Sequence, residues 1–196
     1  MPCLDLPLEN GRLSYYPQFL LRDEADALLD YSLHELAWRR DDIVIAGRRI
    51  PLPRLQNYYG DTGTEYAYSR IPLTPLPWPD PLRQLAQRLE TLCEQRFNAV
   101  LANQYRDGRD SVDWHSDDEA VLGTTPVIAS VSLGAPREFQ LKSRGRLPTS
   151  RFKVTLAHGS LLVMHAPTQQ YWLHRLPKAP WESLPRVNFT FRHIVT

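Results

Sequence analysis

From residue 97 onwards the chain consists of short apolar segments separated by turns that contain glycine and proline, such as Gly134-Ala-Pro136 and His158-Gly159. The strand candidates cover residues 98–105, 127–133, 137–142, 151–157, 160–164, 170–174 and 186–193. Many short strands with such turns favour a sandwich or barrel, and two four-stranded sheets make a jelly roll. The sequence therefore predicts an α+β, mainly β, fold with a double-stranded β-helix (jelly-roll) core.

Two helices in the N-terminal half are expected to back this core. From Asp23, a plausible N-cap, apolar residues recur at helical spacing. A proline-rich connector over residues 72–81 then ends at Asp80-Pro81, an N-cap followed by proline at the first helical position. The stripe of the second helix comprises Leu82, Leu85, Ala86, Leu89, Leu92, Cys93 and Phe97. At 196 residues the chain is expected to form a single domain, 1–196.

The stretch Asn103 to Glu119 contains a histidine and a carboxylate, His115 and Asp117, two positions apart. On an extended backbone such residues point the same way, so both can face one metal ion. His174 offers a third ligand. Two imidazoles and one carboxylate are the donor set of the facial triad of non-haem Fe(II) oxygenases, in which other coordination positions stay open. Ordinary buried histidines remain the alternative from these residues alone, and a hydrolytic zinc site would use the same triad.

The segment Arg186 to Arg192 alternates in a way that favours an anion site beside a core. As a strand it sends Arg186, Asn188, Thr190 and Arg192 to one face and Val187, Phe189 and Phe191 to the other. Arginine is the usual bidentate donor to a carboxylate, so a 2-oxo acid that chelates iron would find its cation here. A zinc hydrolase gives these arginines no obvious partner. Asn103 and Tyr105, two apart on another strand, add hydrogen-bonding groups.

Charge and cysteine content narrow the class of protein. The net charge is +1, but residues 137–153 hold six basic side chains against Glu138 alone. This segment suits a polyanion, although a solvated hairpin explains it equally well.

Two distant cysteines argue against a disulfide framework and for a reducing compartment, cytoplasmic or, in a eukaryote, nuclear. We expect no secretion signal and no membrane association, because the N-terminus lacks a basic and an apolar region and no apolar run is long enough.

Two further stretches could contact nucleic acid. Residues 39–55 read as a hairpin with Gly47 at its turn, in which Ile43 to Gly47 are bracketed by Arg39, Arg40, Arg48, Arg49 and Arg54. Tyr66 and Tyr68 share one strand face and could stack on a base. An amphipathic hairpin over the core and half-buried strand tyrosines are the plainer interpretations.

Taken together, these motifs resemble the AlkB-type Fe(II)/2-oxoglutarate dioxygenases, nearest the branch of nucleic-acid demethylase homologues. The resemblance rests on Asn103-Gln-Tyr105-Arg-Asp-Gly, His115-Ser-Asp117-Asp118-Glu119, Ile128-Ala-Ser-Val-Ser-Leu-Gly, Ala157-His-Gly-Ser-Leu-Leu, Trp172-Leu-His174 and Arg186-Val-Asn-Phe-Thr-Phe-Arg192. The motifs follow the family's order and spacing, and with Tyr59-Gly-Asp and Tyr66-Ala-Tyr68 the match spans roughly residues 40–194.

By this resemblance, His115, Asp117 and His174 hold Fe(II). Arg192 and Asn103 lie near the chelating end of 2-oxoglutarate, Arg186 and Tyr105 hold its distal carboxylate, and Thr190 lines the same site. The base pocket comprises Tyr66, Tyr68, Asp118 and Glu119, with the hairpin tip Ile45, Ala46 and Gly47 beside it. The resemblance also implies a helix and nucleotide-recognition hairpin region over 13–80 and a jelly-roll catalytic core over 98–194.

The implied reaction consumes O2 and 2-oxoglutarate to remove methyl groups from bases such as 1-methyladenine and 3-methylcytosine in alkylated DNA or RNA. Formaldehyde, succinate and CO2 are released, and we expect a monomer. One position departs from the relative specialised for duplex DNA, whose hairpin tip carries an aromatic residue where this chain has Ala46. A methyl group is a poor wedge. This predicts a preference for single strands, or a gap filled by Ile45.

Two other functions remain open at this point. A dioxygenase of the same fold could act on a protein side chain or a small molecule instead of nucleic acid. A catalytically silent module could use a metal-stabilised sandwich only to bind nucleic acid, although the intact set of iron and cosubstrate residues argues against it.

Overall fold

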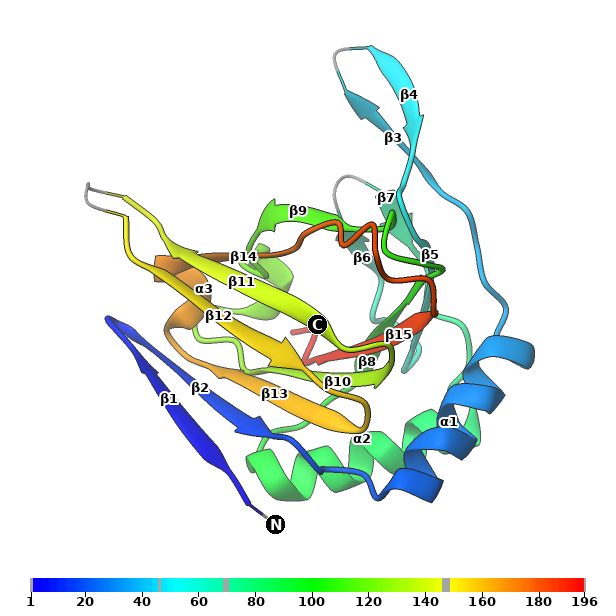
Figure 1. The fold of residues 1–196 in the computed structure, drawn as a ribbon, viewed down its shortest axis with the longest axis horizontal. Coiled ribbons are helices and arrows are strands. Elements are labelled where there is room, and N and C mark those ends of the chain that lie inside the picture. The colour runs from blue at the N-terminus through cyan, green and yellow to red at the C-terminus, as the bar shows by residue number, and fades with distance from the viewer. Residues whose placement is uncertain (1, 46, 69–70, 146–148, 196) are drawn as a thin grey trace.

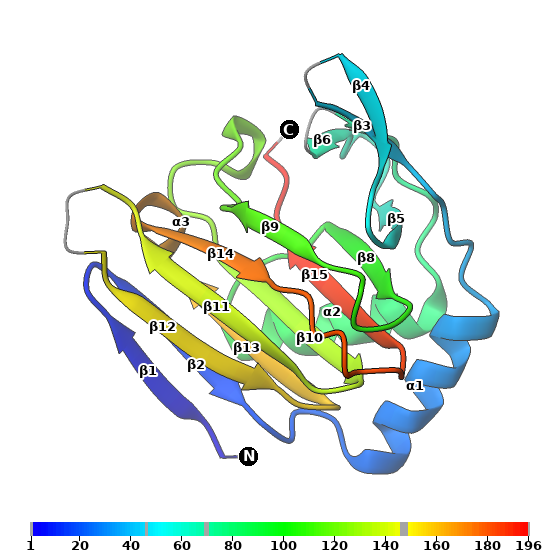
Figure 2. The same ribbon diagram turned by 45° about the horizontal axis from the view of Figure 1, so that its top comes forward.

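The computed structural model describes residues 2–45, 47–68, 71–145 and 149–195. Two β-sheets face each other, and two helices cover the outer side of the larger one (Figures 1 and 2). In spatial order the larger sheet comprises β1 (Leu4–Leu8), β2 (Gly11–Tyr16), β13 (Ser160–His165), β10 (Ile128–Gly134), β15 (Arg186–Arg192), β8 (Ala99–Tyr105) and β5 (Leu55–Gly60). The smaller comprises β12 (Arg151–Leu156), β11 (Arg137–Ser143), β14 (Trp172–Leu176) and β9 (Val112–His115). This arrangement confirms the predicted mainly β class with a jelly-roll core.

The sheets differ in size from the prediction of four strands each. The larger sheet has seven strands, because β1 and β2 extend it beyond β13 and β5 pairs with β8 at its other edge. The strands predicted from the sequence do not include β1 or β9. The strand predicted to begin at residue 170 begins at Trp172 instead, after the short helix α3 (Thr168–Tyr171).

Helices α1 (Arg22–His34) and α2 (Asp80–Cys93) lie against the outer face of the larger sheet (Figure 1). Their predicted caps were wrong, because Leu21 and Pro79 occupy the N-cap positions and neither helix has a side-chain cap. Burial of the apolar stripe therefore stabilises α2 more than capping does. A short 3-10 turn spans Ala120–Leu122. No helix in the described ranges is long and apolar enough to cross a membrane.

Strand β15 separates the core from the pocket. Val187, Phe189 and Phe191 are fully buried in the cluster between the larger sheet and the helices. The alternate residues face the space between the two sheets, as the period of two predicted. The strand lies between β10 and β8, where both of its edges are paired. A rigid central strand thereby holds the polar row, which comprises Arg186, Asn188, Thr190 and Arg192.

Two small sheets lie at one side of this core, near β5, and the β3–β4 sheet projects from it in both views (Figures 1 and 2). One pairs β3 (Asp42–Ile45) with β4 (Arg48–Pro51), and the other pairs β6 (Tyr66–Tyr68) with β7 (Ile71–Leu73). The predicted hairpin is confirmed, with Gly47 at its turn and a φ of 78° that glycine adopts without strain. Ala46 lies outside the described residues.

Candidate metal centre and cosubstrate pocket

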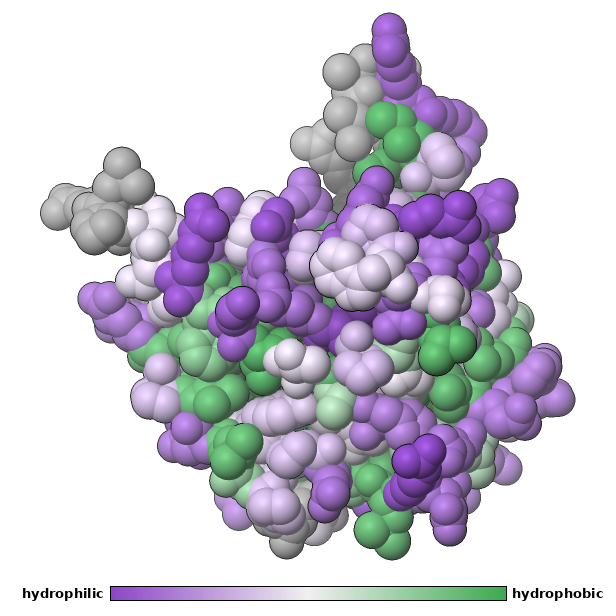
Figure 3. All heavy atoms as spheres, in the orientation of Figure 1, coloured by the Kyte–Doolittle hydropathy of each residue, from purple (hydrophilic) through white to green (hydrophobic). Residues whose placement is uncertain are grey.

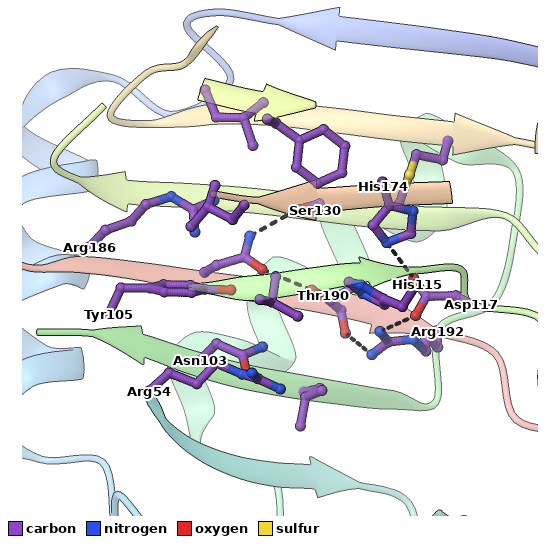
Figure 4. A pocket seen from close by; sticks show the side chains of 17 residues that line it. Arg54, Asn103, Tyr105, His115, Asp117, Ser130, His174, Arg186, Thr190 and Arg192 are labelled. Carbon is purple, nitrogen blue, oxygen red and sulfur yellow. Dashed lines mark hydrogen bonds and ion pairs between the residues drawn. The ribbon is translucent and has the colours of Figure 1, made fainter. Parts of the chain in front are cut away.

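His115, Asp117 and His174 converge at one end of a pocket between the two sheets (Figure 4). Their potential ligand atoms all lie within 4.8 Å of one another, and no other group of this kind occurs among the described residues. His115 and His174 are direct cross-strand partners on β9 and β14, with ring centroids 4.2 Å apart. Asp117 follows β9, two residues after His115. Strand pairing thus brings together residues that are distant in the sequence.

The partners of His115 and Asp117 orient them for metal binding. His115 Nδ1 lies 2.7 Å from the carbonyl oxygen of Asp113, which can only accept a hydrogen bond. The proton therefore sits on Nδ1 and Nε2 keeps its lone pair. The buried Asp117 carboxylate accepts a 2.7 Å hydrogen bond from Arg192, and its backbone N–H donates to Gln169 Oε1. The arrangement fits a divalent ion with open positions, as expected for a facial triad.

Electrostatics keep these groups in the protonation states that metal ligands need. Burial, reinforced by the nearby His115 ring, lowers the pKa of His174 to about 3. Burial also lowers the pKa of His115. Burial alone would raise the pKa of Asp117, but Arg192 and the two imidazoles bring it down to about 2. At neutral pH the centre thus offers two neutral imidazoles and one carboxylate.

These shifts predict an acid-sensitive metal-free protein. Unfolded His174 binds a proton near pH 6.5, whereas the folded residue stays neutral down to about pH 3. The free energy of unfolding should therefore fall as the pH drops through this window, by up to about 1.4 kcal/mol per pH unit for this residue. Urea unfolding of the chelator-treated protein between pH 7.5 and 4.5 measures the slope. His174→Gln should reduce the slope by about 1.4 kcal/mol per pH unit, which corresponds to the uptake of about one proton on unfolding. An unchanged slope in that variant would contradict the assignment of the pH dependence to His174.

The opposite end of the pocket carries the buried guanidinium of Arg186 (Figure 4). It donates to Ser132 Oγ at 2.9 Å and lies 5.1 Å from the centre of the Tyr105 ring. Its Nε has no hydrogen-bond partner among the described residues. Burial lowers the pKa of Arg186 to about 10, with Tyr105 opposing and Arg137 adding to the shift. A buried cation with an unused donor fits the distal carboxylate of a dicarboxylic 2-oxo acid.

Arg54 lies in a different environment from the one that the sequence predicts. The hairpin interpretation groups it with the arginines that could hold phosphates. The structure buries it in the pocket, where Nε donates to Asn103 Oδ1 at 2.8 Å. Asn103 therefore turns its amide nitrogen, a donor, away from Arg54. Arg54 lies three residues beyond β4 and just before β5, and its spacing carries no signal that separates it from its exposed neighbours.

Between the two ends of the pocket, the polar row of β15 is internally hydrogen-bonded. Asn188 donates to Ser130 Oγ and to the carbonyl of Val131, and Thr190 donates its hydroxyl proton to Asn188 Oδ1. Thr190 thus presents an oxygen acceptor to the pocket. By the family resemblance, Arg192 lies near the end of 2-oxoglutarate that chelates the metal. In the structure Arg192 lies beside Asp117, at the metal end of the pocket.

Other basic and histidine residues play structural parts. Arg137, counted in the basic segment, is buried and donates to the carbonyls of Asp110 and Pro177. Its guanidinium is 6.0 Å from the Tyr105 ring. His158 lies in the turn between β12 and β13 and contacts Gly134 and Asp26. His165 ends β13 beside Ser14, so neither histidine contributes to the metal centre.

The predicted base-pocket residues surround the metal end only in part. Asp118 follows Asp117 and forms a 2.7 Å ion pair with Arg144, a partner that the sequence did not suggest. Glu119 immediately precedes the 3-10 turn. Tyr66 and Tyr68 lie on β6, as predicted, but their side chains, like that of Ile45, are outside the described residues. Their role in binding a base therefore stays a prediction.

Comparison with known proteins agrees with this geometry. The model of the "2OG-Fe(II) oxygenase superfamily" matches residues 12–192. The mouse "Alpha-ketoglutarate-dependent dioxygenase alkB homolog 3" is 40% identical over 96% of this chain and 68% of its own length. The bovine "DNA oxidative demethylase ALKBH2" is 43% identical over 78% of this chain and 57% of its own. Among solved structures, OsALKBH1 covers 97% of this chain and is itself covered completely, with a TM-score of 0.66 at 15% identity.

The family match extends over nearly the whole jelly roll and includes every residue at the two ends of the pocket. The enzymes that it describes use Fe(II), 2-oxoglutarate and O2, for which the His-Asp-His group and the buried Arg186 provide fitting partners. The chain belongs to the 2OG-Fe(II) oxygenase superfamily.

Proposed function

We propose that this protein oxidatively demethylates alkylated nucleobases of the 1-methyladenine and 3-methylcytosine type in nucleic acid, as a dealkylation repair enzyme. The supporting observation is the pocket itself, a His-Asp-His group at one end and a buried guanidinium at the other, in a chain about 40% identical to named nucleic-acid demethylases. DNA or RNA would be the partner and the protein would act as a monomer in the cytoplasm or nucleus.

Within this proposal, His115, Asp117 and His174 would hold Fe(II), and the bound ion would supply O2 activation. One oxygen atom of O2 would be inserted into the methyl C–H bond, and the other would be taken up in succinate as 2-oxoglutarate loses CO2. The resulting N-hydroxymethyl group then breaks down to formaldehyde and the unmodified base.

The chain's own residues contribute position and charge. Arg186 pairs with the distal carboxylate of 2-oxoglutarate, beside Tyr105. The amide nitrogen of Asn103, turned by Arg54, and the oxygen of Thr190 offer a donor and an acceptor along the cosubstrate. Arg192 keeps Asp117 ionised at the metal end. These groups orient the cosubstrate in a buried space that excludes water.

Substrate recognition is proposed for the residues beyond the metal end. Tyr66, Tyr68, Asp118 and Glu119 would surround the lesion base, and Ile45, Ala46 and Gly47 at the hairpin tip would contact the strand. Entry of a cationic methylated base beside Asp118 would compete with Arg144 for the same carboxylate. The methyl side chain of Ala46 favours single-stranded substrates over duplexes.

A turnover assay over matched single- and double-stranded oligonucleotides that carry 3-methylcytosine tests the proposal. Formaldehyde and succinate should form in equal amounts and faster from the single strand. Methylated peptides form the second arm, because a dioxygenase of the same fold could act on protein. Formaldehyde from peptides but from no oligonucleotide would contradict a nucleic-acid function. The protein is incubated with Fe(II) in one sample and with Zn(II) in another to separate oxygenase from hydrolase chemistry.

A further inference from the structure

Most surface cations in the described part of the chain lie within 4 Å of a carboxylate. Examples on different elements are Arg22 with Asp26, Arg88 with Glu24, Arg109 with Asp107 and Arg144 with Asp118. With a net charge of only +1, the chain has nearly enough carboxylates to pair every cation. A group of surface cations that lack carboxylate partners therefore indicates a candidate anion-binding surface.

One such place is the outer, solvent-facing side of the four-stranded sheet. We call it the cationic sheet face and define it by Trp114 on β9, Arg175 on β14, Lys142 on β11, and Arg151 and Lys153 on β12. Among these cations only Lys153 has a carboxylate partner in the described structure, Glu138 at 3.0 Å. Figure 3 shows hydrophilic side chains gathered over β11 and β14 on this side of the molecule. A hollow on it is lined by Trp114, Gln140, Arg151 and Lys153, together with Glu138, the partner of Lys153.

Two cations of this face, Lys142 and Arg175, are held in place by their neighbours. The Lys142 ammonium and the Arg175 guanidinium each lie 4.4 Å from the centre of the Trp114 ring. Arg175 Nε also donates to Gln140 Oε1 at 2.8 Å. A ring fixes a cation without neutralising its charge. The positive charges are thus positioned while most of their hydrogen-bond donors remain available to an anion.

Lys142 and Arg151 are direct cross-strand partners on β11 and β12. Like charges directly opposite each other destabilise a sheet. No carboxylate of the described residues lies within ion-pairing distance of either cation to offset this repulsion. An anionic partner with repeated charges would remove that cost, and a phosphodiester strand provides charges at a spacing of a few ångströms along its backbone.

The face is adjacent to the active site. Trp114 and His115 are consecutive on β9, so their side chains point to opposite faces of the smaller sheet. β9 is the edge strand of that sheet. A chain that leaves the metal end and bends around β9 would therefore reach Trp114 first, then Arg175 and Lys142. A single strand is flexible enough to bend in this way. A duplex is too stiff, because its persistence length is about 150 base pairs.

We propose that the cationic sheet face binds the phosphodiester backbone of the single-stranded segment flanking the lesion. The inference rests on the proposed function, because it takes nucleic acid as the substrate. It adds a second contact surface, separate from the hairpin and the base pocket. Longer single-stranded substrates would consequently bind more tightly than short ones, without any change at the metal centre.

The test compares Lys142→Gln/Arg151→Gln with the unchanged protein. Arg175 is left intact because it neighbours His174. The substrates are a trinucleotide with a central 3-methylcytosine and a single strand of about 15 nucleotides with the same core. For the longer strand the variant should raise KM roughly 5- to 25-fold at 0.1 M salt, for one or two lost phosphate contacts. Its kcat, and both constants for the trinucleotide, should be unchanged.

Binding of a labelled, unmethylated single strand to the metal-free protein gives a second readout that needs no turnover. The slope of log affinity against log salt should become shallower by about 0.7 per lost phosphate contact. Lys178→Gln is the matched control, since it removes an exposed cation from the 177–185 loop and should leave the slope unchanged. The variant should also be no less stable, because it relieves like-charge repulsion.

Each outcome decides a different claim. Equal affinity and slope for the double variant and the unchanged protein would overturn the cationic sheet face as a binding surface. An equal loss for a duplex of the same length would overturn the single-strand assignment. Absence of turnover on the trinucleotide as well as the longer strand, already in the unchanged protein, would instead contradict the proposed function.

Discussion

Asp117→Asn is expected to lower turnover by at least about a thousandfold, because it removes the only anionic ligand of the proposed iron site. The amide retains the shape of the carboxylate but not its charge. One carboxylate oxygen lies 2.7 Å from Arg192, and the other lies 3.9 Å from His174 Nε2. The substitution therefore leaves a buried guanidinium beside a neutral group. Breaking a buried ion pair in this way typically costs about 3–5 kcal/mol of stability.

Two measurements separate the effects on metal binding and on folding. Metal affinity, measured by titration with Mn(II), should fall together with turnover, and urea unfolding of the metal-free variant should show the lost stability. Asp113→Asn, at an exposed position on the same strand β9, is the matched control and should stay within about 0.5 kcal/mol of the unchanged protein. Metal-dependent turnover that survives in Asp117→Asn would exclude Asp117 as a ligand.

Arg186→Met is expected to weaken 2-oxoglutarate binding by roughly 30- to 1,000-fold, equivalent to about 2–4 kcal/mol for a buried charge pair that loses one partner. The same substitution should not destabilise the cosubstrate-free protein. Burial lowers the pKa of Arg186 to about 10, so the folded structure disfavours its charge. The charged side chain thus lowers the stability of the folded protein but raises its affinity for 2-oxoglutarate, a combination typical of a functional residue.

Anaerobic titration of the iron-loaded protein with two keto acids provides the control. 2-Oxoglutarate should bind the variant weakly, whereas a 2-oxo acid without a distal carboxylate should bind the variant and the unchanged protein alike. A similar loss for both acids would place Arg186 away from the distal carboxylate. Urea unfolding of the cosubstrate-free variant tests the stability half of the prediction, and a loss of several kcal/mol would contradict it.

The alternation of polar and apolar residues was the part of the pocket that could be predicted best. On β15 a period of two directs every second residue, from Arg186 to Arg192, toward the pocket. It directs the intervening Val187, Phe189 and Phe191 into the core, and the structure agrees at each position. The spacing of His115 and Asp117 likewise predicted a shared direction. These features are local, because neighbouring side chains on a strand alternate whatever the strand pairs with.

The environments of isolated charged residues could not be predicted in the same way. From the sequence, Arg54, Arg137 and Arg144 fall in basic segments that are interpreted either as phosphate-binding or as ordinary hairpins. The structure buries Arg54 beside Asn103, buries Arg137 among backbone carbonyls of two loops, and pairs Arg144 with Asp118. Each partner lies at least 26 residues away in sequence. The partner decides whether a guanidinium can be buried, and nothing in the local pattern identifies it.

By itself, the amino-acid sequence determined the jelly-roll class, the two covering helices, the β3–β4 hairpin and the faces of the strands that line the pocket. Only the tertiary structure decided that β14 pairs with β9 so that His174 lies opposite His115, and that Lys142, Arg151 and Arg175 gather on one outer face. The reason is physical: face alternation follows from the geometry of each strand, whereas cross-strand neighbours depend on which strand edges meet once the whole chain has folded.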